Sequence, residues 1–196
     1  MSLKKLPDAI AEKIVGTEKP LLLLFQDEAR FGRMSDPARC WAPAPIRPTV
    51  GLALIREFRY FYAAIGPQEG TLHWMASEKM NTECMGVFLR QVGQAHPDRH
   101  VVMVVDGASS HRAKALEIPD NISLIQLPPY SPELNPTEIL WHELREKCCA
   151  NRVFDSLEAV CQEVETGLQL FSDDPSRVTR LSGWPWIVKS ISLNAT

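Results

Sequence analysis

Two short, continuous apolar runs, each followed by an aspartate, constrain the fold of this chain more than any other feature. The first reads LLLLFQD and ends at Asp27, and the second reads VVMVVD and ends at Asp106. Uninterrupted apolar runs of this length are typical of strands that a sheet buries on both faces. Because sites in open α/β sheets gather at the carboxyl ends of strands, we expect the two aspartates to lie near each other.

The rest of the chain predicts helices and further strands around these two runs. β-Branched and aromatic residues predict strands at 49–66 and 71–77, joined by a turn at GPQEG. A hairpin followed by alternating helices and strands indicates an α/β fold, with a mixed five-stranded sheet and helices on both faces. The remaining predicted elements are a helix or linker at 3–15, a strand at 122–129, and helices at 81–95, 109–117, 138–150 and 157–170.

Length and composition allow one domain with short appendages. The 196 residues are 45% hydrophobic, which suffices for a sizeable core. We divide the chain into an N-terminal helix or linker (1–19), the α/β domain (20–172) and a C-terminal tail (173–196). The tail contains GWPWIV, and we expect its two tryptophans to pack on the domain.

Neither a membrane span nor a secretory signal is apparent, and we expect a cytoplasmic protein. The apolar run at 21–25 is far too short to cross a bilayer. The five cysteines are an odd number without CxxC spacing, which argues against disulfides and a zinc knuckle. Cys148, Cys149 and Cys161 leave a metal cluster as the alternative to thiols packed in the core.

The charge distribution is uneven. A net charge of −3 is unfavourable for a nucleic-acid-binding protein, but residues 30–59 carry six arginines against two acids. A solvated loop face explains this stretch equally well. Four prolines predict an irregular loop at 29–48, and its Trp41 is expected either to stack on a base or to pack beneath the loop.

A third acid, Glu138, follows an unusually stiff segment, LPPYSPELNPTE. Four prolines fall within nine residues. Local helix chemistry offers one explanation, with Asn135 as N-cap, Pro136 at the first helical position and Glu138 at the third, as in a capping box. The alternative is that the prolines hold the first helical turn in place, so that the Glu138 carboxylate faces Asp27 and Asp106.

Three carboxylates at one place would have a definite chemistry. Like charges raise one another's pKa unless a cation lies between them. Oxygen ligands from two aspartates and a glutamate suit Mg²⁺ or Mn²⁺, and two such ions support in-line phosphoryl displacement. The competing interpretations are that Asp27 simply ends its strand and that Asp106 caps the helix at 109–117.

Three motifs resemble the catalytic domain of DDE transposases, in particular the mariner-like superfamily and its bacterial insertion-sequence relatives. They are FQDEARFGR, VVDGASSHRA and LPPYSPELNPTEILWHEL, and the resemblance covers residues 21–154. It implies an RNase H-like fold with a catalytic triad of Asp27, Asp106 and Glu138 that binds two Mg²⁺, for which Mn²⁺ can substitute. It also implies DNA cleavage at transposon ends, strand transfer, and a homodimer on DNA.

The sequence departs from this pattern at two places. Gly107 stands where many relatives have asparagine after the second aspartate. Only about twenty residues precede the first strand, which leaves no room for the usual helix-turn-helix region that recognises transposon ends. We therefore expect a catalytic part whose end recognition either resides in a separate polypeptide or is missing.

Five residues are candidates for DNA contacts. Arg30 and Arg33 follow Asp27 closely, His111 follows Asp106, and His142 and Arg145 lie at i+4 and i+7 from Glu138 on one helix face. A local hydrogen bond for His111 and a solvated face for the other helix pair are the alternatives, and Trp141 is assigned to the core. Two other functions also fit the sequence: a metal-dependent nuclease without joining activity, and a non-catalytic remnant that binds DNA or multimerises.

Overall fold

A mixed five-stranded sheet in the order β3-β2-β1-β4-β5 forms the centre of the molecule. The computed structural model describes residues 6–13, 16–35, 37–107, 115–128 and 131–187. β1 pairs antiparallel with β2 and parallel with β4, which confirms the predicted mixed sheet. The strands are β1 (Leu21–Met34), β2 (Leu54–Gly66), β3 (Thr71–Ser77), β4 (His100–Val105) and β5 (Ile122–Gln126).

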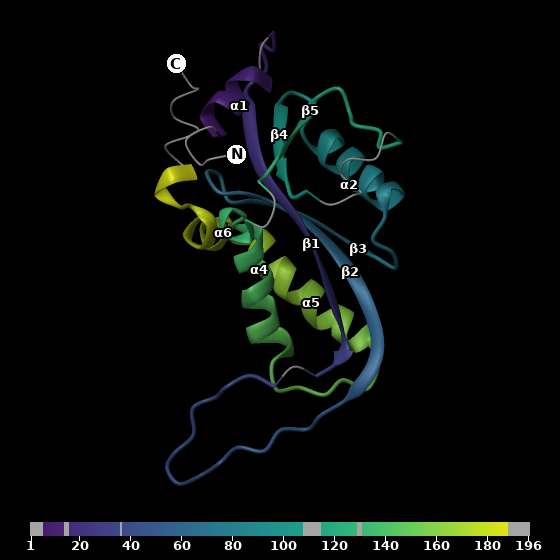
Figure 1. Cartoon of the computed structure of the whole chain (residues 1–196), viewed down its shortest axis with the longest axis vertical. Coiled ribbons are helices and arrows are strands. Elements are labelled where there is room, and N and C mark those ends of the chain that lie inside the picture. Colours follow the sequence, from purple (N-terminus) through teal and green to yellow (C-terminus); the bar gives the residue numbers. More distant parts are fainter. Residues whose placement is uncertain (1–5, 14–15, 36, 108–114, 129–130, 188–196) are drawn as a thin grey trace.

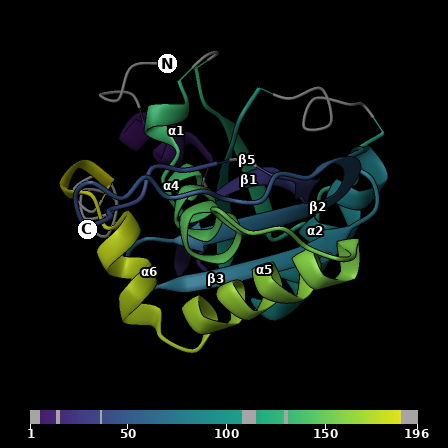
Figure 2. The same cartoon turned by 90° about the horizontal axis from the view of Figure 1, so that it is seen from below.

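Helices cover both faces of this sheet, as predicted. In Figure 1, α2 lies to the right of the sheet, whereas α4 and α6 lie to the left and α5 crosses behind β1; the buried residues of α5 share one core with those of α4 and α6. Figure 2 shows α5 running alongside β3, with α6 at one end of it. The helices are α1 (Leu6–Lys13), α2 (Thr82–Ala95), α4 (Thr137–Leu144), α5 (Leu157–Ser172) and α6 (Pro175–Ser182), with a 3₁₀ turn η2 (Pro132–Leu134) and a π-helical turn η3 (Arg145–Cys149).

Two apolar cores, one on each face, explain why β1 begins as a continuous apolar run. Leu23 and Phe25 belong to the core beneath α4, α5 and α6. Leu22 and Leu24 belong to the core beneath α2. Successive side chains of a strand point to opposite faces, so a strand covered on both sides needs apolar residues at every position.

β1 does not end at Asp27 but continues to Met34, so the predicted loop at 29–48 was placed too early. Ala29 and Phe31 are buried in the same core as Phe25, which is the alternation of a strand with one face inward. Pairing with β2 continues from Phe25 to Met34 and supports this extension. The irregular connection instead comprises residues 35 and 37–53, and Figure 1 shows it projecting away from the sheet.

The second strand and the tail also differ from prediction. β2 begins at Leu54, five residues later than predicted. The tail contains α6, a helix that the sequence analysis did not predict, and Trp186 then packs edge-on against Phe25 with ring centroids 6.3 Å apart. Most of the helix predicted at 109–117 lies outside the described residues.

Four of the five cysteines are partly buried, and Cys40 is exposed. All five cysteines are free. Cys148, Cys149 and Cys161 pack against the core beneath α5, and the described residues contain no cluster of them that would hold a metal ion. Across the described ranges, the helices are too short or too polar to cross a membrane. Trp41 is fully exposed, so the prediction that it packs beneath the loop was wrong.

Candidate active site

Asp27 lies on β1 just beyond the point where β4 ends. The last pair between the two parallel strands is Phe25 with Val104, whereas β2 still pairs with β1 at Asp27. Asp27 is 7% exposed and points to the face of the sheet that α4 covers. Val104 belongs to the core on that face, and alternation along the chain directs Asp106, two residues later, to the same side.

The Asp27 carboxyl group is buried close to other negative charges. Burial, the nearby Glu138 and Glu28 carboxylates and, to a smaller extent, Asp106 together raise the pKa of Asp27 to about 8. The Glu28 backbone N–H opposes this shift by donating to the carboxylate. Two of the acids singled out in the sequence, Glu138 and Asp106, therefore lie within electrostatic reach of the third, Asp27.

Trp141 of α4 binds the Asp27 side chain directly. Its indole Nε1–H donates a hydrogen bond of 3.1 Å to Asp27 Oδ2, and the ring packs against Phe31 with centroids 6.0 Å apart. The sequence analysis placed Trp141 in the core, which is correct, but missed the bond. The signal was available, because a buried tryptophan usually finds a partner for its N–H.

Two polar side chains tie the beginning of α4 to β1 beside Asp27. Thr137 Oγ1 donates to the Phe25 carbonyl oxygen at 2.7 Å, and Asn135 Nδ2 donates to the Gln26 carbonyl oxygen at 3.0 Å. Asn135 and Thr137 are both buried. Glu138 is the next residue after Thr137, so these bonds fix where its carboxylate emerges.

The capping-box explanation of Glu138 is wrong. The Asn135 backbone N–H donates to the Pro132 carbonyl oxygen at 2.9 Å, and the helix begins at Thr137, which places Glu138 second. Asn135 Oδ1 instead accepts from the Thr137 N–H at 3.2 Å. The buried Pro136 and the 3₁₀ turn at Pro132 bring Asn135 and Thr137 to β1, which agrees with the positioning role predicted for the prolines.

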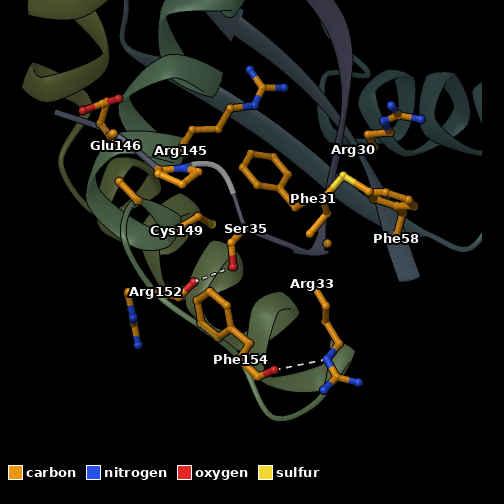
Figure 3. A pocket seen from close by; sticks show the side chains of 15 residues that line it. Arg30, Phe31, Arg33, Ser35, Phe58, Arg145, Glu146, Cys149, Arg152 and Phe154 are labelled. Carbon is orange, nitrogen blue, oxygen red and sulfur yellow. Dashed lines mark hydrogen bonds between the residues drawn. The ribbon is translucent and has the colours of Figure 1, made fainter. Parts of the chain in front are cut away.

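Three of the predicted DNA-binding residues line one cavity of about 420 Å³, farther along β1 (Figure 3). They are Arg30 and Arg33 from β1 and Arg145 from η3. His142 is exposed on α4 and does not line this cavity. His111 lies outside the described residues.

A family model described as "DDE superfamily endonuclease" matches residues 22–161. The chain is also 30% identical over 132 residues to an uncharacterised protein, y4pE/y4sA, of Sinorhizobium fredii, which covers 67% of this chain and 98% of that protein.

Solved structures of the Mos1 transposase share the fold. The Mos1 strand transfer complex superposes with a TM-score of 0.56 at 16% identity, over 93% of this chain and 61% of the Mos1 chain. The mariner Mos1 paired end complex with Mg gives a TM-score of 0.58 at 14% identity, over 97% and 60% of the two chains. The present chain thus spans about three-fifths of the Mos1 transposase and has its RNase H-like fold. Together with the match over residues 22–161, this architecture shows that the chain belongs to the DDE superfamily of endonucleases.

Proposed function

We propose that this chain is the catalytic part of an insertion-sequence transposase that cleaves DNA strands and joins them to target DNA. The observation that carries the proposal is the buried Asp27 carboxyl group, on which the charges of Glu138, Glu28 and, more weakly, Asp106 act. Family membership supports a phosphodiester substrate. The Mos1 structures add support, because they include complexes with a transposon end and with Mg or Mn.

The donor atoms suit a hard divalent cation. Three carboxylates supply only oxygen ligands, which favour Mg²⁺ or Mn²⁺ over softer metals. A cation at this place would relieve the repulsion that raises the pKa of Asp27 to about 8. Within the described residues, no three acidic, histidine or cysteine side chains already form a metal-binding group, so the assignment rests on donor chemistry. Two bound ions would activate the attacking oxygen and stabilise the leaving oxygen.

The chain's own residues orient the acids for this chemistry. The Trp141 N–H fixes one oxygen of Asp27, which leaves the other oxygen for a ligand. Asn135 and Thr137 hold the first turn of α4 against β1 and so set the position of Glu138. In cleavage, water attacks the scissile phosphorus and the strand leaves with a 3′-hydroxyl. In strand transfer, that hydroxyl gives up its proton and attacks a phosphorus of the target strand, whose bond to its own 3′-oxygen breaks, so that the target 3′ end leaves as a hydroxyl.

The partners follow from the same proposal. Of the five residues predicted to contact DNA, we assign contacts to Arg30, Arg145, His142 and His111, whereas Arg33 is paired with Glu57. We expect a homodimer that brings two DNA ends together. We place the protein in the bacterial cytoplasm, at the nucleoid when it acts.

The test is cleavage of a labelled DNA duplex by the purified chain in Mg²⁺ or Mn²⁺, with a supercoiled plasmid as target. Glu138→Gln and Asp106→Asn should each lower cleavage by at least about 100-fold, since even residues that only support a metal ligand cost 10–100-fold. Glu133→Gln is the matched control, because Glu133 is exposed on η2 in the same segment. It should cleave like the wild type.

The products separate the competing functions. Labelled DNA joined to the plasmid supports the transposase, whereas cleavage without joining supports a nuclease on the same fold. If the wild type is as inactive as Asp106→Asn in both metals, also with a DNA-recognition polypeptide added, the catalytic proposal fails. A non-catalytic remnant then becomes the better description.

A further inference from the structure

The cavity at the far end of β1 combines four arginines with three phenylalanines. It lies between β1, η3 and the segment that follows η3 (Figure 3). The arginines are Arg30, Arg33, Arg145 and Arg152, and among the described residues that line it the only acid is Glu146. In a chain with a net charge of −3, such a concentration of positive charge is a local exception.

Two of the four arginines are neutralised by carboxylates. Arg33 pairs with Glu57 at 3.0 Å and also donates through Nε to the Phe154 carbonyl oxygen at 3.1 Å. Arg152 pairs with Glu163 at 2.8 Å. These bonds connect β1, β2, α5 and the segment after η3, so the two arginines hold the walls of the cavity together.

The other two arginines rest on aromatic rings instead. The Arg30 guanidinium lies 4.8 Å from the centre of the Phe58 ring, and that of Arg145 lies 5.3 Å from the centre of the Phe31 ring. Within the part of the chain that the structure describes, neither forms an ion pair. A ring supports a guanidinium through its face and leaves its N–H donors available for an anion. Both side chains are exposed.

Arg30 and Arg145 lie at similar distances from the candidate active site, Arg30 along β1 and Arg145 along α4 and η3. Arg30 lies three residues beyond Asp27 on a strand, which is about 10 Å, and alternation turns its side chain to the opposite face of the sheet, beside the edge of β1 that β4 leaves open. Arg145 lies seven residues beyond Glu138 on a helix, which is also about 10 Å. The contacts of Trp141 with Asp27 and of Arg145 with Phe31 show that α4 and β1 run side by side in the same direction.

We propose that Arg30 and Arg145 form a phosphate-binding subsite for the backbone of the DNA whose scissile phosphate lies at Asp27, Asp106 and Glu138. A separation of about 10 Å corresponds to roughly three nucleotides at the 3.4 Å rise of duplex DNA. Arg33 and Arg152 act differently, since they maintain the shape of the cavity through their ion pairs. The identity of the ligand as DNA rests on the proposed function.

The test measures the salt dependence of DNA binding without cleavage. The full chain is titrated onto a fluorescein-labelled 30-base-pair duplex in EDTA at a series of KCl concentrations. For the double variant Arg30→Gln/Arg145→Gln, the slope of log K against log salt should fall in magnitude by about 2, because each lost phosphate contact removes about 0.9. Arg145→Lys keeps the positive charge, so this variant should keep most of the contribution that residue 145 makes to the slope of log K against log salt.

A matched control removes the same charge elsewhere. Arg90 and Arg180 are exposed on α2 and α6, away from the cavity, and Arg90→Gln/Arg180→Gln should retain the wild-type slope. Thermal melting by circular dichroism verifies that each variant is folded. An unchanged slope in Arg30→Gln/Arg145→Gln overturns the subsite. If the variant with the unchanged slope also loses self-association in sedimentation, the cavity is a contact with a second copy instead.

The two proposals can fail separately. Glu138→Gln should bind the duplex with the wild-type slope while it no longer cleaves, because the subsite does not include Glu138. Wild-type cleavage in Mg²⁺ together with an unchanged slope in the arginine variant would overturn the subsite alone. The predicted change in slope without any wild-type cleavage would overturn the catalytic function alone.

Discussion

The two halves of β1 differ in how many of their faces an apolar core covers, and their composition follows from that difference. Residues 21–25 pair with β4 and place side chains in a core on each face of the sheet, and all five are apolar. Residues 26–34 pair with β2 but have passed the end of β4, and they include Asp27, Arg30 and Arg33. Residues 26–34, the open half of β1, can therefore present charged groups to a ligand. Residues 21–25, the buried half, anchor the strand.

The change from one half to the other coincides with the candidate active site. Phe25 makes the last pair with β4, and the carbonyl oxygens of Phe25 and Gln26 accept bonds from α4 through Thr137 and Asn135. Asp27 comes next. The end of β4 thus frees the space for the acids, and α4 supplies the hydrogen bonds that hold the strand at that point.

The largest expected contrast between the halves is in stability. Phe25 is fully buried between the sheet and Trp186, so Phe25→Ala should lower the free energy of unfolding by about 3–5 kcal/mol. Arg30→Ala removes an exposed ring contact and should cost about 1 kcal/mol or less. Urea unfolding measures both. Equal losses would mean that the open half contributes to the fold as much as the buried half.

Gly32 is the position in the open half of β1 at which we expect a larger side chain not to be tolerated. A Cβ there would overlap the Glu57 carbonyl oxygen and the Phe58 ring, next to the register shift between β1 and β2. We expect Gly32→Ala to cost about 1–3 kcal/mol, as overpacked sites do. Gly86 in α2 is the control, because its nearest neighbour would be Arg90 Nη1 at 3.6 Å.

Gly86→Ala should stabilise the protein by about 0.5–1 kcal/mol, since alanine is the better helix former and the space is available. Thermal melts of the two variants give the comparison. A stable Gly32→Ala variant would show that β1 and β2 can move apart at their far ends.

Asp27→Asn tests how much a buried charge lowers the free energy of unfolding at the boundary between the two halves of β1. The pKa of Asp27 is about 8 in the folded protein against 3.8 for an ordinary aspartate, so in EDTA the stabilising contribution of its protonated form is lost as pH rises from about 4 to about 8. The amide that replaces the carboxyl group in this variant does not titrate. At pH 8 in EDTA, Asp27→Asn should be more stable than the wild type by about 1–3 kcal/mol.

Divalent ions should reverse this order. Adding Mg²⁺ at pH 8 should raise the melting temperature of the wild type, because the ion binds only the folded carboxylates, and should affect Asp27→Asn much less. Melts at pH 5 and pH 8, with and without Mg²⁺, measure all four states. A wild type whose stability is independent of pH between 4 and 8 would contradict the buried, charge-crowded environment of Asp27.

Local sequence patterns predicted the buried half of β1 and the neighbouring β4, because an apolar side chain at every position indicates a strand that is buried on both faces. The open half was missed since Gln26, Asp27 and Glu28 interrupt the apolar run. The only local sign of a strand there was the alternation of Ala29 and Phe31. Whether these residues form a strand depends on pairing with β2, which is distant in the sequence. The helix α6 had local signals, with Asp174 as N-cap and Pro175 in the first turn, that were read as a tail.

In the candidate site, sequence patterns identified the acids but not the side chains that orient them. Asn135 looked like a helix-capping residue, a role that needs no tertiary partner, and Thr137 was not singled out. Their actual acceptors lie 109 and 112 residues earlier in the chain. Local reasoning has no access to such a partner unless a buried donor is known to need one, as Trp141 does.

Trp141→Phe makes the smallest expected change, because it removes one hydrogen bond and keeps an aromatic ring in the core. We expect a loss of about 1 kcal/mol in unfolding free energy. The indole N–H favours the ionised Asp27 carboxylate, so its removal should raise the pKa of Asp27 further and move the acid limb of the cleavage pH profile upward. Trp74→Phe on β3 is the control for ring size alone. If both variants have the same pH profile, Trp141 only fills the core, and the boundary in β1 needs no hydrogen bond from α4 to orient Asp27.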